Sequence, residues 1–315
     1  MFRYAMARIA IMIPTLLCVL FLTFVLGYYG PLDPAKLIAR QQMAMGLNVT
    51  EEEMARLRHD YGLDRPLLVQ FGAYLDNLLH GDLGMSYATK VPVFYLISKS
   101  LPTSLLLAAG AGLILFVVGI PLGAVAALRH NTWLDYAIVG TSLFLNAVPI
   151  YVLGPLLMII LVLYLHLMPV PRGFQGPFAP STFLFYFLLC LGPMATIIRQ
   201  TRAGVLDVLT NDYVRTAHAK GLPPRAVVLR HVLKNAAIPV VTALGMMVSS
   251  FITGTVFLDT MFNIPGFGRV FSTALSGRDF TTIYACVVLI AIFTMLANLI
   301  VDLIYPLLDP RVVYK

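Results

Sequence analysis

The residues of this chain that are able to perform covalent or metal chemistry are few and scattered. The three cysteines, Cys18, Cys190 and Cys286, lie within apolar runs, and the six histidines are dispersed along the sequence. The sequence contains no phosphate-binding G-x-x-x-x-G-K-[ST] loop, no H-E-x-x-H zinc pair and no G-x-S-x-G nucleophile turn. We therefore expect no catalytic residue, no metal site, and packed thiols rather than disulfides.

A basic segment at residues 212–239 has instead the composition expected of a contact with another protein. It reads DYVRTAHAKGLPPRAVVLRHVLKNAAIP. Asp212 is suited to cap a first helix, Gly221 to end it in a left-handed turn, and Pro223 and Pro224 to begin a second helix. A polar helix-turn-helix between apolar runs suggests a transporter subunit that is driven by another protein.

Membrane-spanning helices must position this segment. Of the 315 residues, 59% are hydrophobic and 12% are charged, which is too apolar for a soluble domain. About 20 apolar residues in a helix cross a hydrocarbon core of roughly 30 Å. The first apolar run is long and lacks a small-residue cleavage site, so we expect a retained span rather than a signal peptide. The sequence predicts an all-α polytopic membrane protein with six transmembrane helices, at residues 9–29, 101–128, 136–165, 183–205, 236–257 and 282–305.

The distribution of basic residues predicts the orientation of these spans. With the N-terminus inside, twelve Lys and Arg residues fall on the cytoplasmic side and three fall in the short external loops. Both termini are therefore predicted to be cytoplasmic. The positive charge behind the net charge of +7 thus lies where membrane topology places it, so we infer no nucleic-acid partner.

The chain is predicted to have three parts. Residues 1–29 hold the cytoplasmic N-terminus and the first span, and residues 30–100 form an extracytoplasmic helical segment. Residues 101–315 form a five-helix core with a cytoplasmic loop at about 206–235. In the external part, Thr50 and Glu53 have the spacing of a capping box, and Gly62 is placed to end that helix.

Polar residues within the apolar runs are candidates for a transport pathway. Asn146 and Pro149 lie in the third run, where proline predicts a kink. Small polar residues of the fifth run recur at helical spacing, but such a face also serves ordinary packing between membrane helices, and both interpretations stay open. Asp302, late in the sixth run, is expected to pair with a basic loop residue. The pathway candidates are Asn146, Thr242, Ser249, Ser250, Thr253 and Asn298.

The basic segment resembles the E-A-A-x-x-x-G coupling loop of ABC-importer permeases. Thr216, Ala217 and Gly221 occupy the two alanine positions and the glycine position, whereas Arg215 replaces the glutamate and Lys234 stands at a common proline position. The pattern YVRTAxAKGL followed by RHxLxNAxIPV is similar to B-type permeases of the oligopeptide and dipeptide importers, a family that also includes nickel importers. The HGDLG, NIPGFGR and DPR elements fit the same family, although it more often has glutamate at the position of Asp259.

The resemblance implies a type I permease in a bacterial inner membrane. It would pair with a homologous C-type permease, two ABC ATPase subunits and an extracytoplasmic peptide-binding protein. The ATPases would bind ATP and magnesium, and this chain would hold no cofactor and perform no catalysis. Peptide would be the substrate. The residues that the resemblance assigns to ATPase coupling are Asp212, Tyr213, Arg215, Thr216, Ala217, Lys220, Gly221 and Arg225.

Two alternatives remain at this point. A permease for nickel or a metal chelate would share the architecture and most of the motifs, although the dispersed histidines weaken this interpretation. A secondary transporter or channel could also have six broken spans. The coupling loop argues against that class, and transport that persists without ATP would argue for it.

Overall fold

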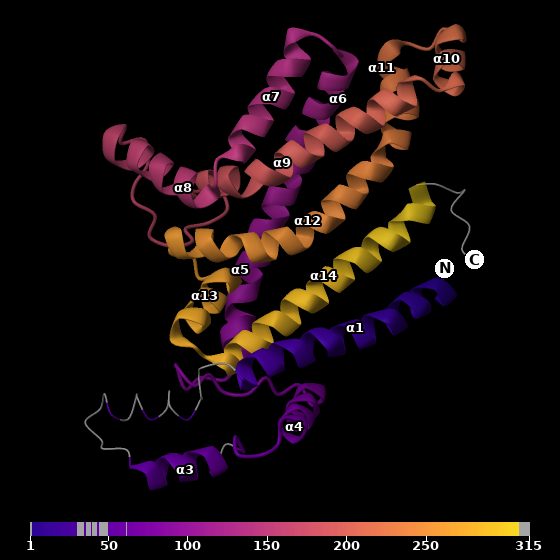
Figure 1. The fold of residues 1–315 in the computed structure, drawn as a ribbon. Helices are drawn as coiled ribbons and strands as arrows, with labels where there is room; N and C mark the ends of the chain where they lie inside the picture. Colours follow the sequence, from indigo (N-terminus) through magenta and orange to yellow (C-terminus); the bar gives the residue numbers. More distant parts are fainter. Residues whose placement is uncertain are drawn as a thin grey trace.

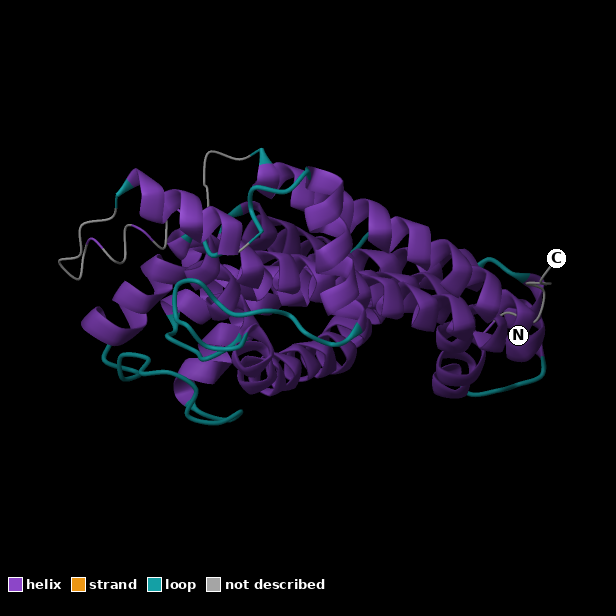
Figure 2. Cartoon of the chain, turned by 90° about the horizontal axis from the view of Figure 1, so that it is seen from below, coloured by secondary structure: helices purple, strands orange, loops and turns teal. Residues whose placement is uncertain are grey.

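The computed structural model describes residues 2–29, 50–60 and 62–308, together with Ala35, Ala39 and Met43. Within these residues the chain consists of helices and loops, with one isolated β-bridge between Met85 and Pro92 (Figure 2). The predicted all-α fold is confirmed. Figure 1 shows that α1 begins and α14 ends at the same end of the molecule.

Four described helices are long and apolar enough to cross a membrane. The first, second, fourth and sixth predicted spans lie in these helices. They are α1 (Phe2–Tyr28), the continuous helix α5–η1–α6 (Val93–Ile114, Leu115–Gly119 and Ile120–Leu128), α9 (Pro180–Leu209) and α14 (Phe280–Leu308). The number reaches six when each of two bent helix pairs is counted as one span.

The third predicted span is broken rather than kinked. Helix α7 (Trp133–Ala147) ends before Val148, and α8 (Ile150–Met158) continues into the π-helical η2 (Ile159–Tyr164). The two halves meet at 94°. Val148 has extended backbone (ψ 120°) because Pro149 follows it, and a proline disfavours the helical conformation of the preceding residue. The kink predicted within 136–165 is therefore present, but as a complete break between two helices.

The fifth predicted span lies within a longer helical region that begins inside the basic segment. A short α11 (Pro224–Ala226) continues through the π-helical η3 (Val227–Val232) into α12 (Leu233–Met261). The helix pair Pro224–Ala237 and Pro239–Gly245 is bent by 52°. Pro239 removes one backbone donor inside the helix, which accounts for the bend.

The main apolar core lies where α5, α9 and α12 meet. Its largest fully buried side chains include Phe185, Leu188, Leu107 and Phe262. Helix α12 lies between α9 and α14, and α1 packs along α14 on the outer side (Figure 1). Packed thiols are confirmed for Cys190 and Cys286, whereas Cys18 is exposed on α1.

Two helices of the segment between the first two spans are described, α3 (Glu51–Asp60) and α4 (Leu67–Leu79). The predicted capping box is present, because the backbone N–H of Thr50 donates to Glu53 Oε2 (2.9 Å) and that of Glu53 donates to Thr50 Oγ1 (3.3 Å). Gly62 has a φ of +63° and ends α3, as predicted. Tyr74 of α4 stacks on Phe24 of α1 and contacts Tyr284 of α14 edge to face, so this part packs on the terminal helices.

The remaining described helix is α13 (Phe267–Gly277), which follows α12 after a tight turn. It leads through Arg278, in the left-handed conformation, into α14. The first helix of the basic segment is α10 (Asp212–Ala219).

Candidate functional site

The basic segment forms the helix-turn-helix that its sequence predicts. Gly221 has a φ of +75°; its N–H donates to His218 O (3.0 Å), and the Leu222 N–H donates to Ala217 O (3.4 Å). These two bonds form a Schellman motif, which satisfies the last carbonyls of α10. Pro224 is the first residue of α11, as expected. The capping prediction for Asp212 was wrong: Asn211 holds the cap position, without a side-chain hydrogen bond, and Asp212 is the first residue of α10.

The α10 helix has one buried edge and a wide exposed face. Val214 and Ala217 are buried against Val227 and Val232, so this edge fixes the helix on the body of the chain. The small side chain of Ala217 therefore serves packing within this chain. The exposed face, which we call the outer coupling face, comprises the other predicted coupling residues: Asp212, Tyr213, Arg215, Thr216, Lys220, Gly221 and Arg225.

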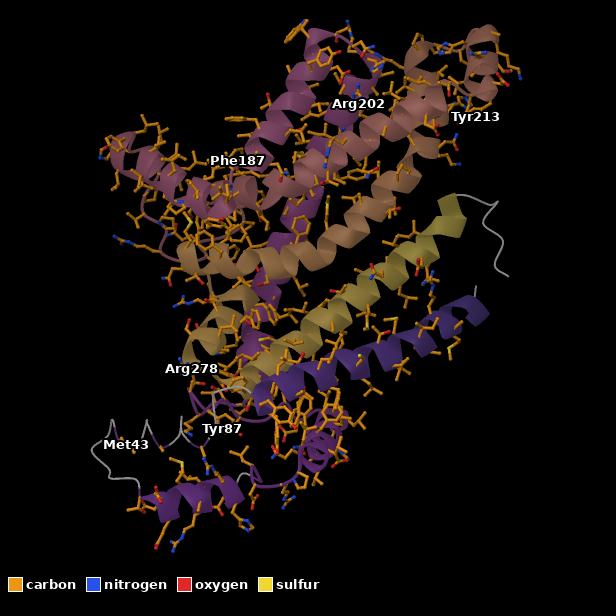
Figure 3. All side chains as sticks on the ribbon, in the orientation of Figure 1. Met43, Tyr87, Phe187, Arg202, Tyr213 and Arg278 are labelled. Atoms are coloured by element: carbon orange, nitrogen blue, oxygen red, sulfur yellow. The ribbon has the colours of Figure 1, made fainter. Side chains whose placement is uncertain are left out.

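Contacts within the outer coupling face are weak. Asp212 Oδ1 lies 3.8 Å from Arg215 Nη1, and both side chains are largely exposed to solvent. Exposed ion pairs of this kind contribute little to stability. Tyr213 lies at the far end of the molecule from the α13 turn (Figure 3). The face is thus held by its buried edge; the Thr216 hydroxyl donates to Asp212 O (2.9 Å), and the charged side chains are exposed.

A second candidate site is a cavity of about 440 Å³ between α7, α9 and α12. Two predicted pathway residues, Asn146 and Thr242, line it, one from α7 and one from α12. Two further polar side chains, Thr196 and Gln200 of α9, complete the polar lining and were not predicted. They follow Gly192 by four and eight residues, which places all three on one face of α9. This spacing is the sequence pattern from which the two residues could have been predicted. The described residues that line this cavity include carboxamides and hydroxyls but no charged side chain.

Glycine shapes the wall of this cavity. A Cβ at Gly192 would stand 3.0 Å from Asn146 Oδ1, which is a very close contact. The glycine therefore leaves room for the carboxamide of Asn146 across the gap between α7 and α9. We call this space, with Asn146, Thr196, Gln200 and Thr242, the α7–α9–α12 cavity.

The remaining pathway candidates do not join this cavity. Ser249, Ser250 and Thr253 belong to α12, and their side chains lie outside the described part of the structure. Asn298 is exposed on α14 and is not among the cavity residues. Asp302 Oδ2 lies 3.2 Å from Arg8 Nε, so the expected pairing is present, but its partner belongs to helix α1 rather than to a loop.

An ion pair that the sequence did not predict joins α7 to α9. Arg202 donates from Nε to Asp135 Oδ1 (2.7 Å) and from Nη2 to Asp135 Oδ2 (2.7 Å). The N–H of Asn131 donates to the same carboxylate (3.0 Å), and His130 Nδ1 lies 2.9 Å from Arg202 Nη2. Asp135 is 1% exposed, and Figure 3 labels Arg202 on α9. We call this group the Asp135–Arg202 pair.

The turn between α12 and α13 is held by a buried carboxylate. Asp259 is fully buried, and its Oδ2 accepts the Gly268 N–H (3.0 Å); Ser104 Oγ accepts the Phe267 N–H (2.8 Å). A Cβ at Gly268 would stand 2.6 Å from backbone atoms of Val256. The shorter acid at position 259 thus anchors this turn.

A cavity of about 420 Å³ adjoins this turn, and Lys99, Arg269 and Asp279 are among its lining residues. Its lining comes from α5, α13, α14 and the loops beside them, and the α7–α9–α12 cavity has no lining residue in common with it. Among the described residues, no group of three or more His, Cys, Asp or Glu side chains is arranged to hold a metal ion.

The chain is similar along its whole length to known transport proteins. Residues 1–108 match the N-terminal part of a binding-protein-dependent transport system membrane component, and residues 119–314 match the family described as binding-protein-dependent transport system inner membrane component. The dipeptide transport system permease protein DppB of Escherichia coli K12 is 32% identical and the oligopeptide transport system permease protein AppB of Bacillus subtilis is 35% identical. The oligopeptide transport system permease protein OppB of E. coli K12 is 33% identical, and all three matches cover 100% of both chains. The chain therefore belongs to the family of binding-protein-dependent transport system inner membrane components.

Proposed function

We propose that this chain is the B-type permease subunit of an ATP-driven dipeptide or oligopeptide importer and forms half of its translocation pathway. The α7–α9–α12 cavity is the observation that carries the proposal. Two of its helices, α9 and α12, are the elements that the basic segment, with its helix α10, connects. A displacement of the coupling helix is therefore able to change the cavity directly. Three relatives named as dipeptide or oligopeptide permeases support peptide as the substrate class.

The cavity has the chemistry needed for peptide groups. The carboxamides of Asn146 and Gln200 each donate and accept hydrogen bonds, as does a peptide unit, and the hydroxyls of Thr196 and Thr242 do the same. Neutral polar groups satisfy a peptide backbone without selecting one charged side chain. This lining suits an importer that accepts peptides of varied sequence.

The partners follow from the class of transporter. An importer permease of this family works with a second permease, ATPase subunits and a binding protein. We propose that the second permease is a homologous C-type chain, that two ABC ATPases bind ATP and magnesium, and that no cofactor is held here. The outer coupling face would contact an ATPase. Its basic and hydroxyl side chains are exposed, and Ala217 is reserved for internal packing.

The proposed setting is a bacterial inner membrane, with both termini in the cytoplasm and residues 30–100 outside. The twelve-to-three division of basic residues supports this orientation. Its test is a cysteine-free variant with one introduced cysteine. A membrane-impermeant thiol reagent should label position 52 in intact cells and leave position 225 unlabelled. The reverse pattern would invert the topology.

The nickel alternative has no observation in its favour. Among the described residues, those that line the α7–α9–α12 cavity include no histidine, cysteine or carboxylate, which are the usual ligands of nickel. The three relatives described above are named for peptides.

The proposal is tested by Asn146→Leu and Gln200→Leu in the complete complex, reconstituted in proteoliposomes with its binding protein. Each variant replaces a carboxamide with an apolar side chain of similar size. Peptide uptake should therefore fall by about tenfold, as for the loss of one good hydrogen bond. Assembly and ATPase activity should stay. Thr260→Val is the control, since Thr260 bonds within its own helix to Val256 O and does not line the cavity. Unchanged uptake in both leucine variants, or uptake that persists without ATP, would refute the proposal.

A further inference from the structure

We infer that the Asp135–Arg202 pair fixes α7 to α9, so that two walls of the α7–α9–α12 cavity move as one unit when the coupling helix moves. The inference rests on the proposed function, because it concerns how the cavity is driven. It assigns Asp135 and Arg202 as positioning residues, since neither is among the residues that line the cavity.

The pair has the geometry of a strong and directional link. One guanidinium donates to both oxygens of one carboxylate, at 2.7 Å each, and the Asn131 N–H donates to the same carboxylate. Charged and bidentate hydrogen bonds of this kind are among the strongest in proteins and fix orientation as well as distance. Asp135 is buried, so loss of Arg202 would leave its carboxylate as a buried charge without its main partner. The link is therefore suited to transmit force between helices.

The same two helices carry the cavity walls. Asp135 and Asn146 both belong to α7, eleven residues apart, which corresponds to about 16 Å along one rigid helix. On α9, Thr196 and Gln200 line the cavity, and Arg202 follows within one turn. A fixed contact between Asp135 and Arg202 thus holds Asn146 in register with the polar face of α9.

Close packing of α6 on α9 reinforces this unit. A Cβ at Gly123 would stand 2.7 Å from Ile198 O and 2.6 Å from Thr201 Cβ. Helix α6 continues into α7 through the turn that contains His130 and Asn131. The α6–α7 hairpin is therefore docked on α9 by a glycine contact on one arm and by the ion pair on the other.

The third wall is formed by α12. Pro239, Thr242, Ala243 and Met247 are on α12, and the chain passes from α9 to α12 only through the coupling segment. Near that segment the two helices approach closely, because a Cβ at Gly204 would stand 3.1 Å from Ala236 O. A displacement of α10 is therefore expected to change the spacing of α9 and α12 about this contact, while α7 follows α9.

The test uses the complete importer in proteoliposomes and measures ATP hydrolysed per peptide transported. Asp135→Asn and Arg202→Met should leave ATP hydrolysis in the assembled complex but lower peptide transported per ATP by about fivefold or more, within the range of coupling between sites. Arg202→Lys, which keeps the charge, should restore part of the ratio. Arg199→Met is the matched control; Arg199 lies on α9 and donates to Ala195 O of its own helix.

A second measurement uses pairs of spin labels and needs no peptide. Labels at positions 136 and 203 report the spacing of α7 and α9, and labels at 203 and 234 report that of α9 and α12. With and without ATP, the first distance should stay constant and the second should change; in Arg202→Met the first distribution should broaden.

Three outcomes would overturn the inference. The first is an unchanged amount of peptide per ATP together with an unbroadened 136–203 distance distribution in Arg202→Met. The second is a 136–203 distance that changes with ATP in the natural protein. The third is a loss of peptide uptake that follows only the amount of assembled complex. Failure of the natural complex to take up peptide with ATP would instead refute the proposed function, and the spin-label result would still decide whether α7 and α9 form one unit.

Discussion

Helices α10 and α12 end in the same backbone motif, but the two motifs lie in very different surroundings. Helix α10 ends in a Schellman motif at Gly221, and α12 ends in one at Asn263, whose φ is +55°. No heavy atom lies within 4 Å of a Cβ built at Gly221. The turn after Asn263, in contrast, packs Phe267 and Gly268 into the interior and is pinned by Asp259 and Ser104.

This difference separates a structure that is complete within one chain from one that is left open. The turn after α12 satisfies its backbone donors with buried side chains of the same chain. The coupling segment buries only one edge and leaves the outer coupling face exposed. The first turn is expected to control whether the chain folds, and the second whether it works with its ATPase.

The largest expected effect is that of Gly268→Ala. The added methyl group would stand 2.6 Å from backbone atoms of Val256, which cannot move aside cheaply, so overpacking should cost about 3 kcal/mol or more. Thermal unfolding of the purified protein in detergent measures this change. Gly277→Ala is the control, because its Cβ would meet only Ala88 Cβ at an ordinary 3.7 Å. Equal unfolding temperatures for the two variants would break the comparison.

An intermediate effect is expected at Gly221. A β-branched residue is strained at a φ of +75°, so Gly221→Val should destabilise this turn by about 1–2 kcal/mol. ATP-driven uptake should fall clearly, while the unfolding temperature of the whole chain should change little. Gly221→Asn should retain most uptake, because asparagine tolerates this conformation, as Asn263 does. Uptake and ATPase activity on one preparation provide the measurement. Wild-type uptake in Gly221→Val would remove this turn from the coupling mechanism.

The smallest effect concerns exposed ion pairs, which we expect to matter little wherever they occur. In the segment before α4, His59 Nδ1 lies 2.8 Å from Asp64 Oδ2. This hydrogen bond raises the pKa of His59 and lowers the pKa of Asp64. The pair should therefore weaken as the pH rises through the pKa of His59 and again as it falls through the pKa of Asp64.

NMR titration of His59 checks this sign. Asp64→Asn should lower the pKa of His59 toward the ordinary value of about 6.5 and leave peptide uptake unchanged. A higher pKa of His59 in the variant would contradict the contact. A loss of peptide uptake would contradict our expectation that exposed ion pairs have little effect on function.

Features with a local cause could be predicted from the sequence. The capping box of Thr50 and Glu53, the left-handed glycines at 62 and 221 and the start of α11 at Pro224 all appear in the structure. The cap at Asp212 was missed by one residue, since Asn211 precedes it with an equally suitable side chain. The break at Pro149 was underestimated because a proline predicts a disturbance but not its angle, which depends on what each half packs against.

The candidate site could be predicted only in part. Polarity within an apolar run selected Asn146 and Thr242, and both line the cavity. The same criterion selected Asn298, which lies elsewhere, and missed Thr196 and Gln200 in the more mixed sequence of α9. Polarity shows that a residue needs a partner or water. It does not show which helix supplies that partner.

The sequence by itself determined the all-α class, the apolar helices, the capping box at Thr50 and Glu53, and the basic segment, because these depend on composition and on residues within a few positions of one another. Only the tertiary structure decided that Arg202 binds Asp135 across 67 residues, that Arg8 pairs with Asp302, and that Gly192 faces Asn146. The physical reason is that helix pairing is set by how whole apolar faces and glycine contacts fit together. The energy of that fit is spread over many side chains, and no short pattern along the chain records it.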